Sequence, residues 1–208
     1  GSSKQALRKI LVGLQLVLSI FLISSTLIMK KQFDYIQNKD LGFDREQLAT
    51  IQLSVSREGN FEERIKLGFE KAEVYKTELS KLPEVIGVAS SSHDFGKGNW
   101  LSVGFTDNNG VYHNFNLNPV DHAYIPTLKM DLVSGRNFSD ANLSDKRRAI
   151  IVNEAFVKEY GWENPIGQKI PGKGFADHEI IGVVKDFHYA SLYQKVEPLV
   201  LLLDPTII

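Results

Sequence analysis

An unbroken apolar run near the start of the chain constrains its fold more than any other feature. Residues 10–29 contain no charged side chain. The polar members of the run are Gln15, Ser19, Ser24, Ser25 and Thr26. As a helix rising about 1.5 Å per residue, the run would span roughly 30 Å, the thickness of a bilayer's hydrocarbon core. A signal peptide has a shorter apolar core, and soluble core helices are rarely apolar all round. We therefore predict a transmembrane helix over residues 10–29.

Basic side chains flank this run at both ends. Arg8 and Lys9 precede it, and Lys30 and Lys31 follow it. Long cationic side chains in such positions reach the lipid headgroups. We expect these four residues to be anchors at the membrane interface, with membrane lipid as a partner. The two flanks carry similar charge, so the positive-inside rule does not assign an orientation.

Polar residues inside the run are expected to pack against other membrane helices. Gln15 carries an amide that is costly to expose to lipid. Ser24 and Ser25 are small enough to let a neighbouring helix approach closely. Their hydroxyls can also bond to carbonyls of the preceding turn, which is an alternative explanation. We predict helix packing in the membrane at Gln15, Ser24 and Ser25.

The first part of the remaining chain has the pattern of a β-α-β unit. No helix breaker occurs between Lys30 and Gly42, so a stalk over residues 30–44 is expected to continue the membrane helix. Residues 48–55 alternate apolar and polar side chains, which is typical of a half-buried strand. Apolar residues three and four apart predict a helix over residues 61–82, ended by Pro83. Residues 85–90 predict the next strand.

The second part predicts a β-rich insertion followed by further strands. The turn residues at 107–110 lie between candidate strands at 102–106 and 111–117, which favours a hairpin. Residues 149–152 form a candidate buried strand. Asn153 follows as an N-cap, with Glu154 in the first turn of a helix that Gly161 ends. Candidate strands at 179–185 and 200–203 complete an α+β fold class.

Composition and scattered histidines argue against several functions. The net charge of −1 and pI near 6.6 provide no basic field for nucleic acid, so no nucleic-acid partner is predicted. His113, His122 and His178 lack the paired spacing of a zinc site, so we expect no metal. Residues 90–94 place serine, histidine and aspartate side by side, but sequence neighbours rarely adopt triad geometry. We predict no catalytic site and no enzyme.

Short motifs in a fixed order resemble the MacB-like periplasmic core domain of FtsX-type ABC transporter permeases. The motifs follow the membrane run over nearly the whole chain. They are Ile36-Gln-Asn-Lys-Asp-Leu-Gly-Phe43, Gly135-Arg-Asn-Phe138, Val152-Asn-Glu-Ala155, Gly161-Trp162, Pro165-Ile-Gly167 and Ile181-Gly-Val-Val-Lys-Asp-Phe187. The residues we assign to structural roles on this basis are Gly135, Arg136, Phe138, Asn153, Glu154, Gly161, Trp162, Pro165, Gly167, Gly182, Asp186 and Phe187.

The resemblance implies a topology and a domain plan. Residues 1–9 would be a cytoplasmic flank, and residues 45–208 a periplasmic core domain at the bacterial inner membrane. That domain would have two lobes. A porter-like β-α-β lobe would comprise residues 45–90 and 148–204, and an inserted β-rich lobe residues 91–147. Because family permeases have four or more membrane helices, the resemblance also implies that this chain is a fragment of the permease subunit.

The resemblance also implies a function, export or mechanotransmission driven by ATP. No Gly-x-x-x-x-Gly-Lys-Ser/Thr loop occurs in the chain, so we predict no cofactor in it and expect a cytoplasmic ABC ATPase subunit to bind the ATP. Further partners implied are a second permease copy or repeat, and a periplasmic adaptor, cargo peptide or lipoprotein. The alternative is the ligand-sensing domain of a membrane-anchored receptor, which has the same layout of one span and an α+β domain.

Overall fold

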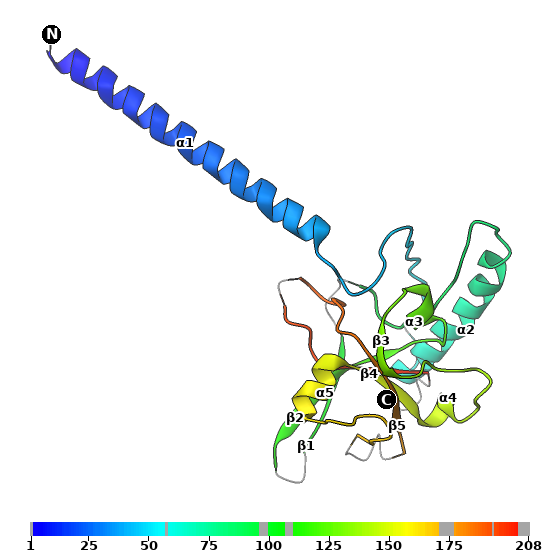
Figure 1. Ribbon diagram of the computed structural model, residues 1–208. Coiled ribbons are helices and arrows are strands. Elements are labelled where there is room, and N and C mark those ends of the chain that lie inside the picture. The colour runs from blue at the N-terminus through cyan, green and yellow to red at the C-terminus, as the bar shows by residue number, and fades with distance from the viewer. Residues whose placement is uncertain are drawn as a thin grey trace. The chain divides into compact units, whose positions relative to one another are not determined.

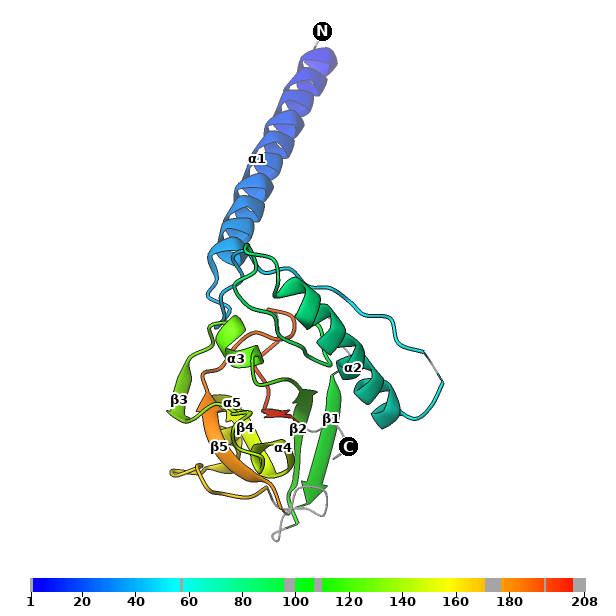
Figure 2. The ribbon, with the colours of Figure 1, turned by 90° about the vertical axis from the view of Figure 1, so that its right-hand side faces the viewer.

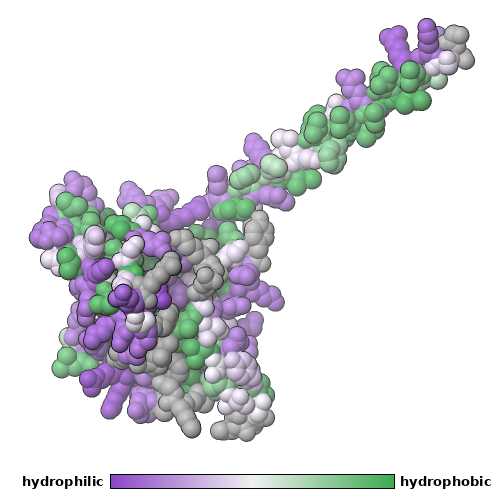
Figure 3. All heavy atoms as spheres, turned by 180° about the vertical axis from the view of Figure 1, so that it is seen from behind, coloured by the Kyte–Doolittle hydropathy of each residue, from purple (hydrophilic) through white to green (hydrophobic). Residues whose placement is uncertain are grey.

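The computed structural model describes residues 2–56, 58–95, 100–106, 110–170, 177–192 and 194–203. The chain divides into two compact units, Gly1–Asp40 and Leu41–Ile208. The first unit is a single helix, α1 (Ser2–Asn38), which contains the whole apolar run (Figure 1). Coloured by hydropathy, α1 is apolar along its middle and polar toward its start (Figure 3).

The helix ends earlier than the sequence predicts. α1 stops at Asn38, whose side-chain amide donates to the carbonyl of Asp34 at 2.8 Å. Residues 39–41 are not helical, and Gly42 follows with φ of +80°. The predicted stalk over residues 30–44 is therefore helical only as far as Asn38, four positions before the glycine that was expected to end it.

The second unit is built on one mixed six-stranded sheet. Its strands are β1 (Leu101–Thr106), β2 (Tyr112–Pro119), β3 (Leu132–Gly135), β4 (Ala149–Asn153), β5 (Glu179–Val184) and β6 (Leu199–Leu202). Their order in space is β1-β2-β6-β4-β5-β3. The pairs β2·β6 and β4·β5 are parallel, and the other three are antiparallel. The central strand β4 is buried along its whole length, as expected for a strand covered on both faces.

Alternate residues of the central strands feed two hydrophobic clusters, one on each face of the sheet. Ile150 and Val152 of β4 join a cluster with Phe115 and Phe156. Ile151 joins the second cluster, which also contains Tyr124, Leu128, Phe138 and Phe187. The two clusters share no residue, so the sheet separates two cores.

Four helices accompany the sheet in the part of the chain that the structure describes. Figure 2 shows how they are arranged around it. They are α2 (Phe61–Leu79), α3 (Tyr124–Thr127), α4 (Asp145–Arg148) and α5 (Glu154–Tyr160). Asn60 caps α2 in a capping box with Glu63. α5 connects the adjacent parallel strands β4 and β5, so the structure contains a β-α-β unit at this point.

The strands predicted at residues 48–55 and 85–90 are wrong. Both segments have no regular structure, so α2 is not flanked by the predicted pair of strands. Instead, the Lys71 ammonium on α2 donates to the carbonyl of Ser54 at 2.9 Å. Residues 48–55 do alternate apolar and polar side chains, but a strand also needs a hydrogen-bonding neighbour strand. This segment lies beside α2 instead. α2 also ends at Leu79, three residues before the predicted end.

Most other predicted elements are confirmed. β1 and β2 form the predicted antiparallel hairpin, although its turn residues 107–109 lie outside the described residues. β4, α5, β5 and β6 occur where the sequence predicts them, and the α+β class is confirmed. β3 was not predicted. Strands from the predicted inserted lobe join strands of the predicted porter-like lobe where β2 pairs with β6. The boundaries of the two lobes stay a prediction.

Candidate functional site

The segment directly after α1 is tied into the second unit by backbone hydrogen bonds. We call residues 41–44 the anchor segment. The carbonyl of Leu41 accepts from the backbone N–H of His188 at 2.7 Å. The N–H of Asp44 donates to the carbonyl of Leu128 at 3.0 Å. The anchor segment is thus held at both ends by two parts of the domain far apart in sequence.

Gly42 allows the anchor segment to lie directly against the backbone at Asp186 and Phe187. Its φ of +80° is a conformation that side-chain-bearing residues rarely adopt. A Cβ atom at this position would lie 2.6 Å from the carbonyl oxygen of Asp186 and 2.8 Å from Cα of Phe187. The close approach therefore requires glycine, which explains the glycine of the Leu-Gly-Phe motif.

Phe43 fixes the anchor segment by packing. Its ring stacks on Phe95 with centroids 4.5 Å apart. Phe95 in turn meets Phe187 edge to face, with ring centroids 6.4 Å apart. The ring centroids of Phe95 and Tyr124 are 6.3 Å apart. Phe187 is fully buried, so these rings connect the anchor segment to the hydrophobic cluster on one face of the sheet.

Asp44 closes the anchor segment with an ion pair. The Lys129 ammonium lies 2.5 Å from the Asp44 carboxylate. The hydrogen bond from Lys129 lowers the pKa of Asp44, and the hydrogen bond from the backbone of Glu46 adds to the effect. Because the pair is exposed to solvent, it contributes little to the free energy of unfolding. We assign it a role in orienting the anchor segment.

The carboxylates of the motif residues Asp186 and Glu154 link the start of α5 to the segment after β5. The Asp186 carboxylate accepts from the N–H of Ala155, in the first turn of α5, at 2.8 Å. The Glu154 carboxylate accepts from the N–H of Asp186 at 3.0 Å. Burial raises the pKa of Asp186, and the nearby Glu154 charge raises it further. The segment that holds Leu41 and Gly42 is therefore also tied to the start of α5.

Asn153 is hydrogen-bonded through both the oxygen and the nitrogen of its side-chain amide. Its side chain is fully buried, and its oxygen accepts from the N–H groups of Phe156 at 3.1 Å and Leu199 at 2.9 Å. Its amide nitrogen donates to the carbonyl of Glu197 at 2.9 Å. The predicted N-cap is confirmed, and the same side chain also joins α5 to the start of β6.

Gly135 and Arg136 hold the edge of the sheet. A Cβ on Gly135 would meet the carbonyl of Ile181 and Cα of Gly182, so β3 and β5 approach closely here. Arg136 makes two parallel hydrogen bonds to the Asp145 carboxylate, at 2.6 and 2.8 Å. Asp145 is buried and also accepts from the N–H of Ser139 at 3.0 Å. The Arg136 pairing lowers the pKa of Asp145.

The remaining motif residues either form turns or pack in the hydrophobic clusters. Phe138 is buried in the cluster that also holds Phe187. Gly161 ends α5 in the left-handed conformation, and Trp162 packs edge to face on Phe156 at 5.9 Å. The carbonyl of Pro165 accepts from the N–H of Gln168 at 3.1 Å, and the N–H of Gly167 donates to the carbonyl of Ile180 at 2.8 Å. This turn therefore packs beside β5.

The serine and histidine at 92 and 93 are hydrogen-bonded in the wrong sense for nucleophilic catalysis. Nε2 of His93 accepts from the N–H of Leu101 at 3.2 Å, so Nδ1 of the neutral ring carries the proton. Nδ1 lies 2.7 Å from the Ser92 hydroxyl and therefore donates to it. Burial lowers the pKa of His93, which keeps the ring neutral. A general base would have to accept the proton of Ser92.

No group of acidic or histidine side chains with metal-binding geometry occurs among the described residues. In the same part of the chain, α1 is the one helix long and apolar enough to cross a membrane. Its flanking cations Arg8, Lys9, Lys30 and Lys31 are exposed. Their anchoring role stays a prediction, as does packing at Gln15, Ser24 and Ser25.

The sequence analysis missed the partners of the motif residues. His188, Leu128 and Lys129 bind the anchor segment, and Asp145 binds Arg136, but no local pattern distinguishes them. The one available signal was the opposite charge of Arg136 and Asp145, nine positions apart, which is too common to identify a pair.

Comparison of the chain with models of known protein families finds a match to one family. A family model described as the MacB-like periplasmic core domain matches residues 10–202. No curated protein matches the chain.

The solved structures that are similar to this chain include two transporter domains. The periplasmic region of MacB from Actinobacillus actinomycetemcomitans shares 19% identity with a TM-score of 0.44, over 65% of this chain and 56% of that one. The extracellular domain of the noncanonic ABC-type transporter YknZ from Gram-positive bacteria shares 19% identity with a TM-score of 0.44, over 63% of this chain and 61% of that one. This chain therefore spans less than two thirds of either solved chain.

The family predicted from the ordered motifs is thus confirmed, and because the matched residues extend over most of its length, this chain belongs to the family of MacB-like periplasmic core domains.

Proposed function

We propose that the chain is the membrane-anchored part of a permease subunit that transmits movement in an ABC-type transporter. In this proposal residues 10–29 cross the bacterial inner membrane and residues 1–9 are cytoplasmic. The domain from residue 45 onward is periplasmic. A separate cytoplasmic ATPase binds and hydrolyses ATP, and its conformational change displaces α1.

The observation that carries this proposal is the attachment of the anchor segment. Only residues 39 and 40 separate the end of α1 from Leu41, which is bonded to His188. Asp44 is bonded to Leu128, and Gly42 lies against Phe187 without space for a side chain. A displacement arriving at residue 41 is therefore passed to the domain over a few residues rather than absorbed in a long linker.

A second set of contacts would carry the displacement further. Asp186 lies one residue before Phe187, and its carboxylate holds the start of α5. Asn153 links that same helix start to β6. The proposed path thus runs from the anchor segment through Asp186 to α5 and the centre of the sheet. A second permease copy or repeat, and a periplasmic adaptor, peptide or lipoprotein cargo, are the partners that such a domain would move or contact.

Purification of the native full-length protein from its own cells in a mild detergent tests the proposal. An ABC-type ATPase should co-purify, with ATP hydrolysis that vanadate inhibits. A preparation in which the partner is a signalling protein and no ATPase appears would replace the permease proposal with the receptor alternative.

A further inference from the structure

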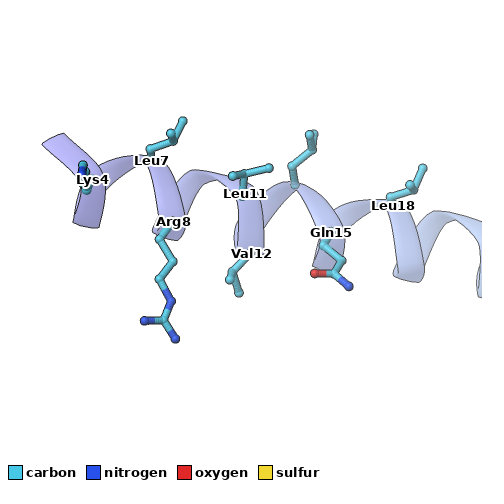
Figure 4. A pocket seen from close by; sticks show the side chains of 8 residues that line it. Lys4, Leu7, Arg8, Leu11, Val12, Gln15 and Leu18 are labelled. Atoms are coloured by element: carbon cyan, nitrogen blue, oxygen red, sulfur yellow. The ribbon is translucent and has the colours of Figure 1, made fainter.

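A hollow along the first half of α1 has walls from that helix alone. Arg8, Val12 and Gln15 point to one side of α1, and Leu7 and Leu11 point to the other (Figure 4). A molecule lying there would be held from one side only. This hollow therefore carries no binding site.

A second cavity lies in the domain, beside the segment that holds the anchor segment. It is bounded by Trp100, by Asn116 of β2 and by side chains from residues 187–190 and 194–197. Its volume is about 180 Å³. An apolar cavity of roughly 150 Å³ is large enough to bind benzene. This cavity can therefore hold one ring with a small substituent.

Aromatic rings supply the apolar part of the cavity lining. The ring of Trp100 meets that of Tyr189 edge to face, with centroids 4.5 Å apart. Trp100 also stacks on His93, with centroids 4.7 Å apart, which fixes the orientation of the indole. Phe187 is fully buried and meets Tyr189 edge to face at a centroid distance of 5.6 Å. Such a lining suits a flat apolar ring.

Two polar groups of the lining residues have no partner. The indole N–H of Trp100 is buried and makes no hydrogen bond. The buried Asn116 amide uses its nitrogen twice, donating to the Tyr189 hydroxyl and to the Glu197 carboxylate, each at 3.0 Å. Its oxygen makes no hydrogen bond within the described part of the chain. One donor and one acceptor are thus left for an occupant of the cavity.

The charges at the cavity favour an uncharged occupant. Besides the imidazole of His188, the ionisable groups of opposite charge in the lining are the ammonium of Lys195 and the carboxylate of Glu197. Their formal charges cancel, so neither an anion nor a cation is attracted by a net field. Burying an ion beside aromatic rings would also carry a desolvation cost.

We propose that this cavity binds a small uncharged molecule that carries a ring and an amide group. The ring packs against Trp100, Phe187 and Tyr189. The amide carbonyl accepts from the Trp100 indole, and the amide N–H donates to the side-chain oxygen of Asn116. This binding site goes beyond the proposed transmission of movement and does not depend on it.

The cavity shares one wall with the attachment of α1. The backbone N–H of His188, which donates to the carbonyl of Leu41 at 2.7 Å, belongs to a residue of the lining. Phe187, against which Gly42 lies, is another lining residue. An occupant therefore holds the segment 187–190 in the conformation that binds the anchor segment.

Hydrogen exchange of the full chain in a mild detergent, with benzamide as the probe, tests this proposal. Benzamide consists of one ring and one primary amide. A ligand that binds the closed site slows exchange by a factor of 1 + [L]/Kd. We expect Kd on the order of 1 mM and, at ten times Kd, about tenfold slower amide exchange at residues 187–190. Unchanged exchange there at every soluble concentration would overturn the proposal.

A cavity-filling variant shows whether benzamide binds at this place. Ala190→Leu adds a larger side chain to the lining, and Ala141→Leu makes the same change at an exposed position. We expect the slowing to disappear in Ala190→Leu and to persist in Ala141→Leu. Equal slowing in both variants would mean that benzamide binds elsewhere, which overturns the proposal.

The amide contacts are tested by a second pair of variants and by a second probe. Trp100→Phe keeps a ring and removes the indole N–H, and Trp162→Phe does the same at the other tryptophan of the chain. We expect Trp100→Phe to weaken benzamide binding about fivefold and Trp162→Phe to leave it unchanged. Benzoate has the same shape but no N–H donor and a negative charge, so it should bind several-fold more weakly. Benzoate binding as tight as benzamide, or no effect of Trp100→Phe, would contradict the assigned ligand class.

Discussion

The Asp186 carboxylate accepts a hydrogen bond from the backbone N–H of Ala155 at 2.8 Å. This bond joins two segments that lie 31 positions apart in sequence and that both belong to motifs of the family resemblance. On the other side of Asp186, the next residue lies against Gly42 of the anchor segment. Asp186 therefore occupies the point where the attachment of α1 meets the start of α5.

Replacing Asp186 with asparagine should change how stability depends on pH. Burial raises the pKa of Asp186 above its usual value of 3.8. The folded state then binds more protons than the unfolded state between 3.8 and the raised pKa, so this group adds stability as pH falls through that window. Asp186→Asn lacks this contribution and keeps an acceptor for Ala155. Its free energy of unfolding relative to wild type should therefore be highest near neutral pH and should decline on acidification.

Urea unfolding at a series of pH values measures this difference. The matched control is Glu163→Gln, an exposed carboxylate with no hydrogen bond among the described contacts. The change with pH of the Asp186→Asn difference should exceed that of this control. A difference for Asp186→Asn that grows as pH falls would show that its pKa is lowered in the folded state.

Gly42→Ala should destabilise the domain through a steric clash. The new Cβ would meet the backbone of Asp186 and Phe187 at 2.6–2.8 Å, in addition to the cost of the positive φ. Gly110 has the same φ of +80° but nothing within 4 Å of its Cβ position. We expect Gly110→Ala to cost about 1 kcal/mol and Gly42→Ala about 2 to 4 kcal/mol in chemical unfolding. Equal losses for the two variants would mean that the close approach at Gly42 does not exist.

Asn153→Ala should be among the most destabilising polar substitutions. It leaves the N–H groups of Phe156 and Leu199 without their acceptor in a fully buried site. The carbonyl of Glu197 loses the Asn153 amide but keeps the hydrogen bond from the Tyr189 hydroxyl at 3.1 Å. At about 1 kcal/mol or more for each of the two orphaned N–H groups, we expect a loss of about 2 kcal/mol or more in the free energy of unfolding. Asn114→Ala, on an exposed position of β2, should cost less than about 0.5 kcal/mol.

Removing the charge of Arg136 should leave Asp145 buried without its counter-ion. Arg136→Met keeps the aliphatic length but removes both hydrogen bonds to the carboxylate. Because Arg136 is half exposed, we expect a loss of about 2 kcal/mol in chemical unfolding, below the value for fully buried pairs. Arg147→Met removes an exposed cation of the same type and should be neutral. The contrary result is an Arg136→Met variant as stable as Arg147→Met.

The sequence predicted those elements whose signal is local. The helix α5 has a start signal at Asn153 and a stop signal at Gly161, both within a few residues. The apolar residues 149–152 identify a strand that is buried on both faces. The strand predicted at residues 48–55 was wrong because an alternating pattern only shows that a strand is possible. A strand forms only where another strand is available for hydrogen bonding. β3 was missed for the converse reason, since its four residues become a strand only by pairing with β5.

The site was predicted in part. Motif residues such as Gly135 and Asp186 were identified by resemblance, whereas Leu128, Lys129 and His188 were not. Their contribution to the anchor segment is mostly through backbone groups and packing, which carry no residue-type signal. Contacts of this kind depend on the register of segments far apart in the chain, and a single sequence does not reveal it.

In the proposed complex with a second permease copy, the distance between the two copies of the domain tests the central claim most directly. One spin label per copy, attached to Leu143→Cys on an exposed loop, reports the separation before and after vanadate trapping of the ATPase. We predict that trapping shifts the distance distribution in the wild-type sequence. A flexible Gly-Ser linker inserted between Asp40 and Leu41 should abolish the shift while ATP hydrolysis continues. An equal shift with and without the linker would contradict the proposal that the anchor segment transmits movement from α1 to the domain.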